Sequence, residues 1–286
     1  MARQRDAVMS IDSFSVFCEG LDHPECATRG PDGVTYAGGE AGQIYRVTLD
    51  GTHEQIASTE GFVLGMCLDA NRNVYACDMA KRAVMKATPD GKVSMYSDGT
   101  RQRKMANPNY PVFDRDGNLY VTDSGRWQQH DGCLYCIRPG GETALVSQKV
   151  THFANGCCLS HDGRSLYVVM SLMPGVVKLP IRTDGSLGDP EPVVDLPGTV
   201  PDGVAFDVQG HLYVSCYAPD IIYRVSPSGE LTVLAHDPLR ITFASPTNIV
   251  FSGEDRKTLV VSNLARWHLS KAQMPHAGQP LNYPHI

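Results

Sequence analysis

The chain repeats one phrase six times: a short apolar run, a polar turn and a second apolar run centred on a tyrosine. The clearest copies are LDANRNVYACD, FDRDGNLYVTD and FDVQGHLYVSC. The central residues of the six copies are Tyr36, Tyr75, Tyr120, Tyr167, Tyr213 and Val260. Successive copies are 39 to 47 residues apart. A period of roughly 40–50 residues is typical of a solenoid, a propeller or an array.

Each repeat reads as four short strands. In the third copy YPVFD leads into the turn RDGN, LYVTD returns, CLYCI forms a third strand, and TALVS follows the turn PGGE as a fourth. No helical periodicity of useful length interrupts the repeats. Four antiparallel strands with a period in the mid-forties match a propeller blade. The sequence therefore predicts an all-β, six-bladed β-propeller, with residues 1–286 as a single domain.

The two ends of the chain predict how the ring closes. The last repeat runs out after ARWHLSKAQ without a fourth strand. Residues Ser13 to Gly20 (SFSVFCEG) have the character of a fourth strand and precede the first repeat. We expect this N-terminal strand to pair with the last blade, because closure removes the open sheet edges of an unclosed array.

Composition narrows the functional classes. No stretch approaches the roughly 20 apolar residues of a membrane span, and the start of the chain has no signal-peptide core, so a cytoplasmic location is expected. A net charge of −6 without a long basic cluster argues against a nucleic-acid partner. The nine cysteines lie mostly in apolar runs and are expected to be reduced core residues. Cys133 and Cys136 have metal-like spacing, but no second pair completes a zinc site.

The residues that open the first strand of each blade should meet at one mouth of the central channel. In chain order these openings are Glu25, Gly65, Asn109, Asn155, Asp202 and Asn248. One reading is that Asn, Asp and Gly make the turns into each strand, but this explains a glutamate poorly. Two carboxylates with amide oxygens instead suit one divalent cation: calcium, magnesium, manganese or zinc.

The set Glu25, Asn155-Gly156 and Pro201-Asp202-Gly203 resembles the senescence-marker-protein/gluconolactonase/luciferin-regenerating-enzyme family of six-bladed propellers. The resemblance extends over essentially the whole chain, including NLYVTDSG and the closing PLNYPHI. It implies that Glu25, Asn155 and Asp202 bind one divalent cation. It also implies that Asn109 contributes to the metal or substrate pocket.

Two departures from the family pattern bear on the substrate. Tyr110 follows Pro108-Asn109 where family members often have an aspartate, which favours a more apolar substrate than a sugar. Pro24-Glu25-Cys26 is closer to the corresponding phrase of strictosidine-synthase-like propellers. Those propellers share the architecture but differ in chemistry, so fold alone does not decide function.

The favoured function is a divalent-metal-dependent lactonase acting on a small lactone or ester. The metal would polarise the carbonyl and activate water, and Asp202 would be both ligand and general base. A carboxylate at a cation has a low pKa, which opposes the second role. The alternatives are an esterase or phosphotriesterase, a strictosidine-synthase-like or other non-hydrolytic enzyme, and a binding propeller without catalysis. No Gly-x-Ser-x-Gly motif signals a serine hydrolase.

Further residues are placed near the same mouth by their position in the repeat. The residues expected to contact substrate are Asn109, Tyr110, Asp123 and Asn248. Asp78 is expected to be structural, and His152 either faces the site or is packed. The residues expected on the surrounding wall are Arg126, Trp127, Arg266, Trp267 and His268. The identity of the metal, the substrate and the oligomeric state stay open.

Overall fold

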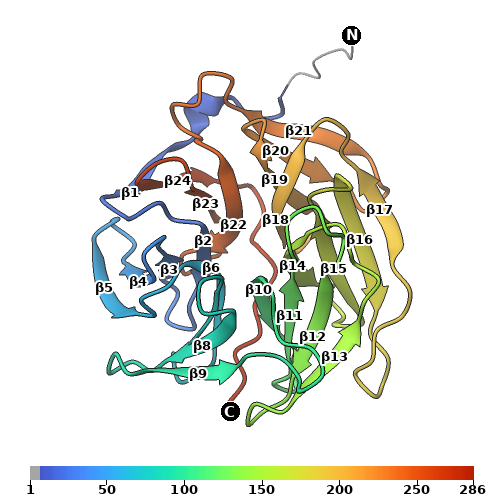
Figure 1. Ribbon diagram of the computed structural model, residues 1–286. Helices are drawn as coiled ribbons and strands as arrows, with labels where there is room; N and C mark the ends of the chain where they lie inside the picture. The colour runs from blue at the N-terminus through green and yellow to red at the C-terminus, as the bar shows by residue number, and fades with distance from the viewer. Residues whose placement is uncertain (1–6) are drawn as a thin grey trace.

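The computed structural model describes residues 7–286, so the first six residues of the predicted domain 1–286 lie outside the described part. It shows six four-stranded antiparallel sheets arranged around a central channel (Figure 1). The only helical element among the described residues is a short 3-10 turn, Ile11–Ser13. The predicted all-β, six-bladed propeller is therefore confirmed.

The blades follow one another in chain order. Blade 1 contains β2 (Cys26–Arg29), β3 (Thr35–Gly38), β4 (Gln43–Val47) and β5 (His53–Ser58). Blade 2 contains β6 (Val63–Leu68), β7 (Val74–Asp78), β8 (Ala83–Ala87) and β9 (Val93–Ser97). Blade 3 contains β10 (Pro108–Phe113), β11 (Leu119–Asp123), β12 (Cys133–Ile137) and β13 (Thr143–Ser147).

The second half of the ring repeats this order. Blade 4 contains β14 (Ala154–Leu159), β15 (Ser165–Met170), β16 (Gly175–Pro180) and β17 (Glu191–Asp195). Blade 5 contains β18 (Val200–Phe206), β19 (Leu212–Ala218), β20 (Ile221–Val225) and β21 (Leu231–His236). Blade 6 contains β22 (Pro246–Ser252), β23 (Thr258–Asn263), β24 (His268–Gln273) and, from the other end of the chain, β1 (Ser15–Glu19).

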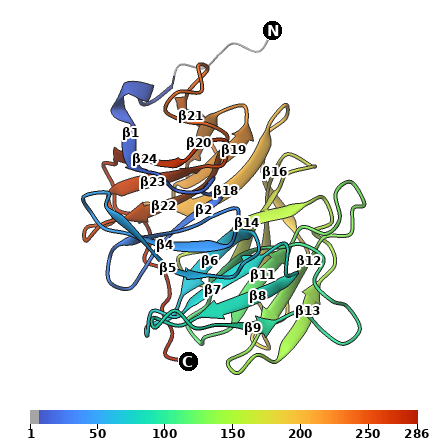
Figure 2. The same cartoon turned by 60° about the vertical axis from the view of Figure 1, so that its left-hand side comes forward.

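The N-terminal strand closes the ring as predicted. β1 pairs antiparallel with β24, with Ser15 opposite Lys271 and Glu19 opposite His268. Figure 2 shows β1 beside β24 at the outer edge of blade 6. The last blade is thus built from both ends of the chain, and its outer edge is covered.

The repeated tyrosines hold neighbouring blades together. The buried apolar residues form six clusters, one at each seam between blades. Tyr75 packs edge-on against Phe113 of the next blade at 5.0 Å, and Tyr213 packs in the same way against Phe251 at 5.3 Å. The repeated phrase therefore encodes the packing of each blade on its successor.

All nine cysteines are free, and seven of them are buried. Cys133 and Cys136 lie on the same strand but enter different seams, one toward blade 2 and the other toward blade 4. Both cysteines are therefore core residues of separate clusters. Within residues 7–286 no helix is long and apolar enough to cross a membrane.

The C-terminal segment crosses the far end of the channel, seen as the red trace in the centre of Figure 1. The Gln279 side chain donates to Leu159 O at 3.0 Å, and the Asn282 side chain donates to Phe113 O at 2.8 Å. Tyr283 Oη donates to Arg29 O at 2.8 Å. The tail thereby ties the ends of three inner strands, those of blades 4, 3 and 1.

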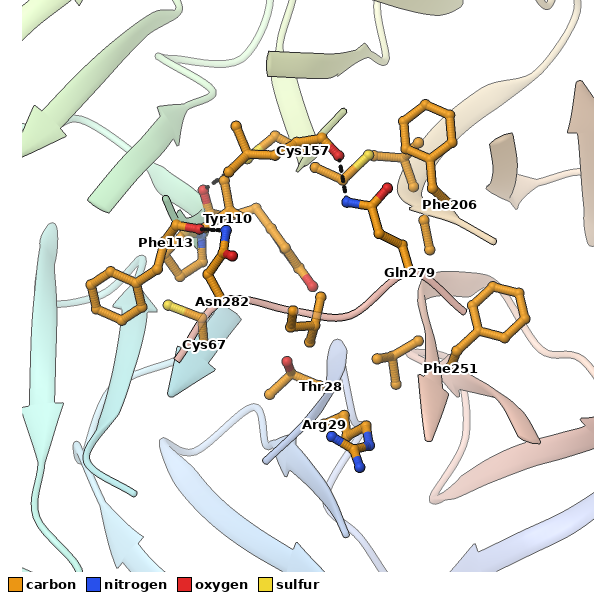
Figure 3. A pocket seen from close by; sticks show the side chains of 18 of the residues that line it. Thr28, Arg29, Cys67, Tyr110, Phe113, Cys157, Phe206, Phe251, Gln279 and Asn282 are labelled. Carbon is orange, nitrogen blue, oxygen red and sulfur yellow. Dashed lines mark hydrogen bonds between the residues drawn. The ribbon is translucent and has the colours of Figure 1, made fainter. Parts of the chain in front are cut away.

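A small cavity lies above this tail, and Figure 3 shows Tyr110 pointing into it between Cys67 and Cys157. Its volume is about 70 Å³, well below the roughly 300 Å³ at which ligand pockets usually begin. The polar openings Asn109 and Asn155 are not among the described residues that line it. A space of this size holds little more than water molecules, and the polar openings lie toward the other mouth.

Replacing Tyr283 with phenylalanine tests the role of the tail. Tyr283→Phe removes the hydroxyl that donates to Arg29 O and accepts from Arg29 Nη1 at 3.4 Å. Loss of a part-buried hydrogen-bonding group should lower the free energy of unfolding by about 1–2 kcal/mol, measured by urea denaturation. The matched control, Tyr217→Phe at an exposed ring, should leave it unchanged. Equal stability of wild type and Tyr283→Phe would show that this hydrogen bond of the tail does not stabilise the fold.

Candidate functional site

A β-bulge shapes the opening of each inner strand in five of the six blades. The blades can be aligned on the inner-strand residue that pairs with the residue directly after the repeated tyrosine, or after Val260 in blade 6. These inner-strand residues are Ala27, Met66, Pro111, Cys157, Val204 and Ile249. Two residues earlier, the equivalent ring positions are Glu25, Leu64, Asn109, Asn155, Asp202 and Thr247. A bulge re-aims side chains at such points.

This register corrects two of the six predicted openings. Gly65 and Asn248 lie one residue beyond the equivalent positions, which Leu64 and Thr247 occupy. The extra residue of a bulge leaves no mark in the sequence, so counting from the polar residues shifted the register. The other four openings, Glu25, Asn109, Asn155 and Asp202, stand where the repeat placed them.

These four polar residues share an unusual property. Each is buried, and each has one side-chain oxygen that is also buried and has no hydrogen-bond partner. The atoms are Glu25 Oε2, Asn109 Oδ1, Asn155 Oδ1 and Asp202 Oδ1. Buried polar atoms are normally paired, and four orphaned oxygens at equivalent positions of one ring mark a place for a ligand. The residues present therefore fit a cation bound by oxygen.

The electrostatics of the two carboxylates support the same interpretation. Burial raises the pKa of Glu25 well above its usual range, and the charge of Asp202 raises it further, while a hydrogen bond from the Thr247 side chain lowers it. Burial also raises the pKa of Asp202 to about 7, opposed by a hydrogen bond from Asn155. Among the described residues, no basic side chain contributes to either shift. Two buried acids thus lack a counter-charge.

Hydroxyl groups of one blade hold the backbone of the site residues in the next. Thr122 Oγ1 donates to Asn155 O at 2.7 Å, and Ser171 Oγ donates to Pro201 O at 2.7 Å. Ser262 Oγ donates to Glu25 O at 3.0 Å. The three donors come from β11, from the residue after β15 and from β23, so the second strand of each blade fixes the opening of its neighbour.

Glycine follows two of the site residues because the inner strands converge there. A Cβ atom added at Gly156 would lie 2.6 Å from Asp202 O, and one added at Gly203 would lie 2.6 Å from Thr247 O. Both distances are far inside van der Waals contact. The pairs Asn155-Gly156 and Asp202-Gly203 therefore combine a side chain for the site with room for the next strand.

The predicted substrate residue Asp123 is buried below the mouth. Its carboxylate accepts hydrogen bonds from Ala106 N at 2.7 Å, Asn107 N at 2.9 Å and Gly125 N at 2.9 Å. It thereby holds the loop that leads into Asn109. Asp78 does the same in blade 2, where it accepts from Phe62 N at 3.1 Å. Contact of Asp123 with substrate stays a prediction, and the structure adds a positioning role.

Two other predicted substrate residues have different surroundings. Asn248 Nδ2 donates to Glu25 O at 3.1 Å, so its amide supports the ligand beside it. Tyr110 lines the lower cavity, where burial raises its pKa well above the usual range.

Sequence reasoning missed Thr247, whose hydroxyl donates to Glu25 O at 2.6 Å, and Asn107, whose Oδ1 is buried without a partner. Thr247 can be recognised as a site residue only from the bulge register. For Asn107, the NPN sequence around it was the sole signal.

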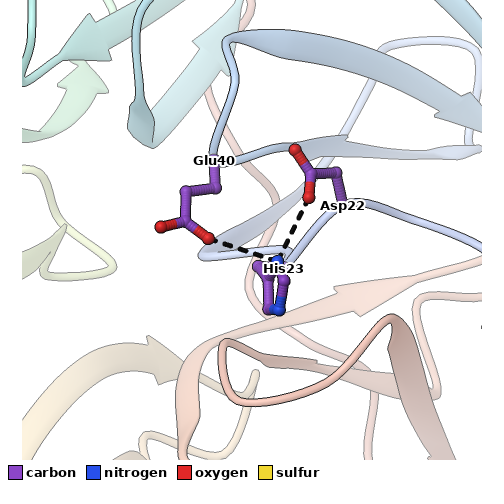
Figure 4. A group of neighbouring side chains, drawn as sticks. All are labelled: Asp22, His23 and Glu40. Carbon is purple, nitrogen blue, oxygen red and sulfur yellow. Dashed lines mark hydrogen bonds and ion pairs between the residues drawn. The ribbon is translucent and has the colours of Figure 1, made fainter.

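A second titratable group lies at the rim of the mouth, two residues before Glu25 (Figure 4). His23 Nδ1 lies 3.1 Å from Asp22 Oδ1 and 3.2 Å from Glu40 Oε2. The ligand atoms of these three residues are close enough together to hold a metal ion. However, Asp22 Oδ2 also accepts from Gln43 Nε2 at 2.9 Å. We interpret the group as a hydrogen-bonded cluster at the rim that orients His23.

Four of the five wall residues expected from the sequence lie in the loops after the second strands, and the fifth, His268, is the first residue of β24. Arg126 pairs with Asp131 at 2.8 Å, and His268 is buried with its Nε2 3.0 Å from Thr242 O. His152 contacts Thr151 Oγ1 at 3.1 Å and packs against the His130 ring. His152 and His268 are thus packed or satisfied locally, which leaves the two tryptophans as the exposed aromatic residues of the wall.

Fold and site together define a six-bladed propeller with an oxygen-lined centre at one mouth of its channel. Comparison with known families gives the same class: residues 34–265 match the SMP-30/Gluconolactonase/LRE-like region. The chain belongs to this family. The resemblance inferred from the Glu25, Asn155 and Asp202 motifs is confirmed.

The relatives differ in the share of their own length that the match to this chain covers. A gluconolactonase of Zymomonas mobilis is 26% identical over 222 residues, which are 69% of this chain but only 60% of that enzyme's length. A gluconolactonase structure from Xanthomonas campestris has a TM-score of 0.79 at 19% identity and covers 92% of this chain and 89% of its own. Calcium-binding regucalcin from Agrobacterium tumefaciens has a TM-score of 0.79 at 16% identity, with 98% of both chains covered. At such identities, the structural likeness shows the fold alone.

Proposed function

We propose that the protein is a divalent-metal-dependent lactonase whose active site is the oxygen-lined mouth of the channel. Glu25, Asn155 and Asp202 are the cation ligands, and Asn109 lies beside them as a ligand or substrate contact. The observation that carries the proposal is the set of buried, unpaired oxygens at equivalent ring positions. Carboxylate and amide oxygens are the donors that hard divalent cations prefer.

The relatives support the reaction class. The matched enzymes of Zymomonas mobilis and Pseudomonas putida are named as a gluconolactonase and a 6-deoxy-6-sulfogluconolactonase. The Agrobacterium tumefaciens regucalcin is named as a calcium-binding protein. These names agree with lactone hydrolysis and with a bound divalent cation.

A divalent cation bound at this centre supplies a Lewis acid that polarises a carbonyl oxygen and lowers the pKa of a water. The protein supplies the remaining functions. Asn109 Nδ2 can donate a hydrogen bond to a lactone oxygen, which orients the ring. Asp202 accepts the proton of the attacking water and returns it to the alkoxide oxygen that leaves the carbonyl carbon. Burial suits Asp202 to this role by raising its pKa to about 7, while a nearby cation lowers that pKa.

Chelation tests the proposal directly. The purified protein is treated with EDTA, its metal content is measured, and hydrolysis of glucono-δ-lactone and γ-phenyl-γ-butyrolactone is followed by proton release. We expect one divalent cation per chain before treatment, loss of hydrolysis after it, and recovery when Ca²⁺, Mn²⁺, Mg²⁺ or Zn²⁺ is returned. Full hydrolysis by metal-free protein would contradict the metal-dependent mechanism. Parallel assays with an aryl ester and a phosphotriester separate lactonase from general esterase activity.

A further inference from the structure

Both tryptophans of the chain lie at the mouth that carries the candidate site. Trp127 and Trp267 follow the second strands of blades 3 and 6 and are 56% and 60% exposed. Because the second strand runs antiparallel to the inner strand, the loop after it lies on the same face as the inner-strand openings. The two largest exposed apolar side chains of the protein thus stand on the rim around Glu25 and Asn155.

Each tryptophan packs against an aromatic ring that lies two residues before a proposed ligand. Trp127 lies 5.1 Å from the Phe153 ring, nearly perpendicular to it, and Phe153 is two residues before Asn155. Trp267 lies 5.5 Å from the His23 ring, and His23 is two residues before Glu25. On both blades, therefore, a tryptophan of a rim loop contacts the segment that leads into a proposed ligand.

The backbone at both inner rings is held in an unfavourable conformation. Phe153 has φ of +61° and His23 has φ of +42°, a region that bulky residues rarely adopt. Such conformations persist where the surroundings enforce them, and they cluster at binding sites. At His23 the carboxylates of Asp22 and Glu40 hold the ring in place (Figure 4).

The two aromatic pairs face each other across the channel. One lies at the seam between blades 3 and 4, and the other lies at the seam between blades 6 and 1. In a ring of six blades these seams are diametrically opposite. The corresponding loops or strand ends of blades 2, 4 and 5 expose Met79, Met173 and Tyr217. Five of the six blades thus present a large apolar side chain toward this rim.

Two arginines at the rim are paired with carboxylates. Arg126 pairs with Asp131 at 2.8 Å and Arg240 with Asp220 at 3.0 Å. Such arginines offer fewer donors to the hydroxyls of a sugar, whereas the aromatic faces remain exposed. A ligand bound at this mouth therefore gains mainly from burying apolar surface against these aromatic faces.

We propose that the mouth selects lactones that carry an apolar substituent, an aryl ring or an alkyl chain, held between the Trp127/Phe153 and Trp267/His23 walls. This inference rests on the proposed lactonase function and names its substrate class. Polyhydroxylated sugar lactones are the poorer substrates, because they leave the aromatic walls unused.

The chain itself provides the probe, since its tryptophan fluorescence comes from Trp127 and Trp267 alone. Titration with γ-phenyl-γ-butyrolactone should change the emission at concentrations where glucono-δ-lactone does not. Trp127→Ala and Trp267→Ala should each lower kcat/KM for the phenyl lactone about tenfold, mainly through KM, and leave the value for glucono-δ-lactone unchanged. Met95→Ala, at an exposed side chain on the outer strand β9, is the control and should change neither value.

The outcomes separate the two proposals. If the phenyl lactone alters tryptophan emission but no lactone is hydrolysed, the lactonase function fails and the apolar site stands. If glucono-δ-lactone is the better substrate, or both tryptophan variants lose the two activities equally, the apolar selectivity is overturned and the lactonase function stands. Phosphatidylcholine vesicles that shift the emission while the phenyl lactone does not would also overturn it, in favour of a lipid surface.

Discussion

Asp202→Asn should abolish both cation binding and lactone hydrolysis while the propeller stays folded. The substitution keeps the shape of the side chain but removes one of the two charges that the site offers a cation. Loss of a supporting partner around a metal typically costs about 10–100-fold, so loss of a charged ligand should lower cation affinity and kcat/KM by more than about 100-fold. Isothermal titration with Ca²⁺ or Mn²⁺ and the proton-release assay measure the two effects.

Two companion variants make this result specific. Glu25→Gln removes the other buried carboxylate and should have the same effect, because Glu25 and Asp202 interact electrostatically. Asp189→Asn removes an exposed acid that pairs only with exposed Lys149 and should leave affinity and activity unchanged. Undiminished cation affinity in Asp202→Asn would place the metal elsewhere, with the Asp22, His23 and Glu40 group as the next candidate.

The fold could be predicted from the sequence because its repeat carries the packing. Tyr75, Tyr120 and Tyr213 recur at a fixed place, and each packs into the seam with the following blade. The closing strand was predictable for a related reason, since one blade lacked a strand that the start of the chain could supply. Both inferences depend on local sequence patterns, which do not change with the tilt of the blades.

The site could be predicted only in part. Glu25, Asn155 and Asp202 stand out by residue type at expected positions, and their buried oxygens lack partners. Thr247 could not be predicted because of the bulge in blade 6, where one extra residue changes which side chain occupies the ring position. The aromatic pairs were also beyond reach, since Trp267 and His23 are 244 positions apart and meet only when the ring closes.

The pH dependence of stability provides an independent test of the buried carboxylates. The pKa of Glu25 and of Asp202 is raised in the folded chain, so in metal-free protein the native state binds more protons than the unfolded state. Stability that depends on this difference is fully present below about pH 4 and is lost as pH rises toward about 7, the pKa of Asp202. EDTA-treated protein should therefore unfold several degrees lower at pH 8 than at pH 5, as measured by calorimetry.

Cation binding should reverse this trend, because the ligand charge that destabilises the metal-free site is the charge that a cation requires. Added Ca²⁺ should raise the Tm more at pH 8 than at pH 5, where protons must first be displaced from the ligands. In the absence of metal, Asp202→Asn should melt above wild type at pH 8, which also shows that its lost activity is not misfolding. A wild-type Tm that rises from pH 5 to pH 8 in EDTA, with no difference from Asp202→Asn, would mean that the two acids do not share a desolvated site.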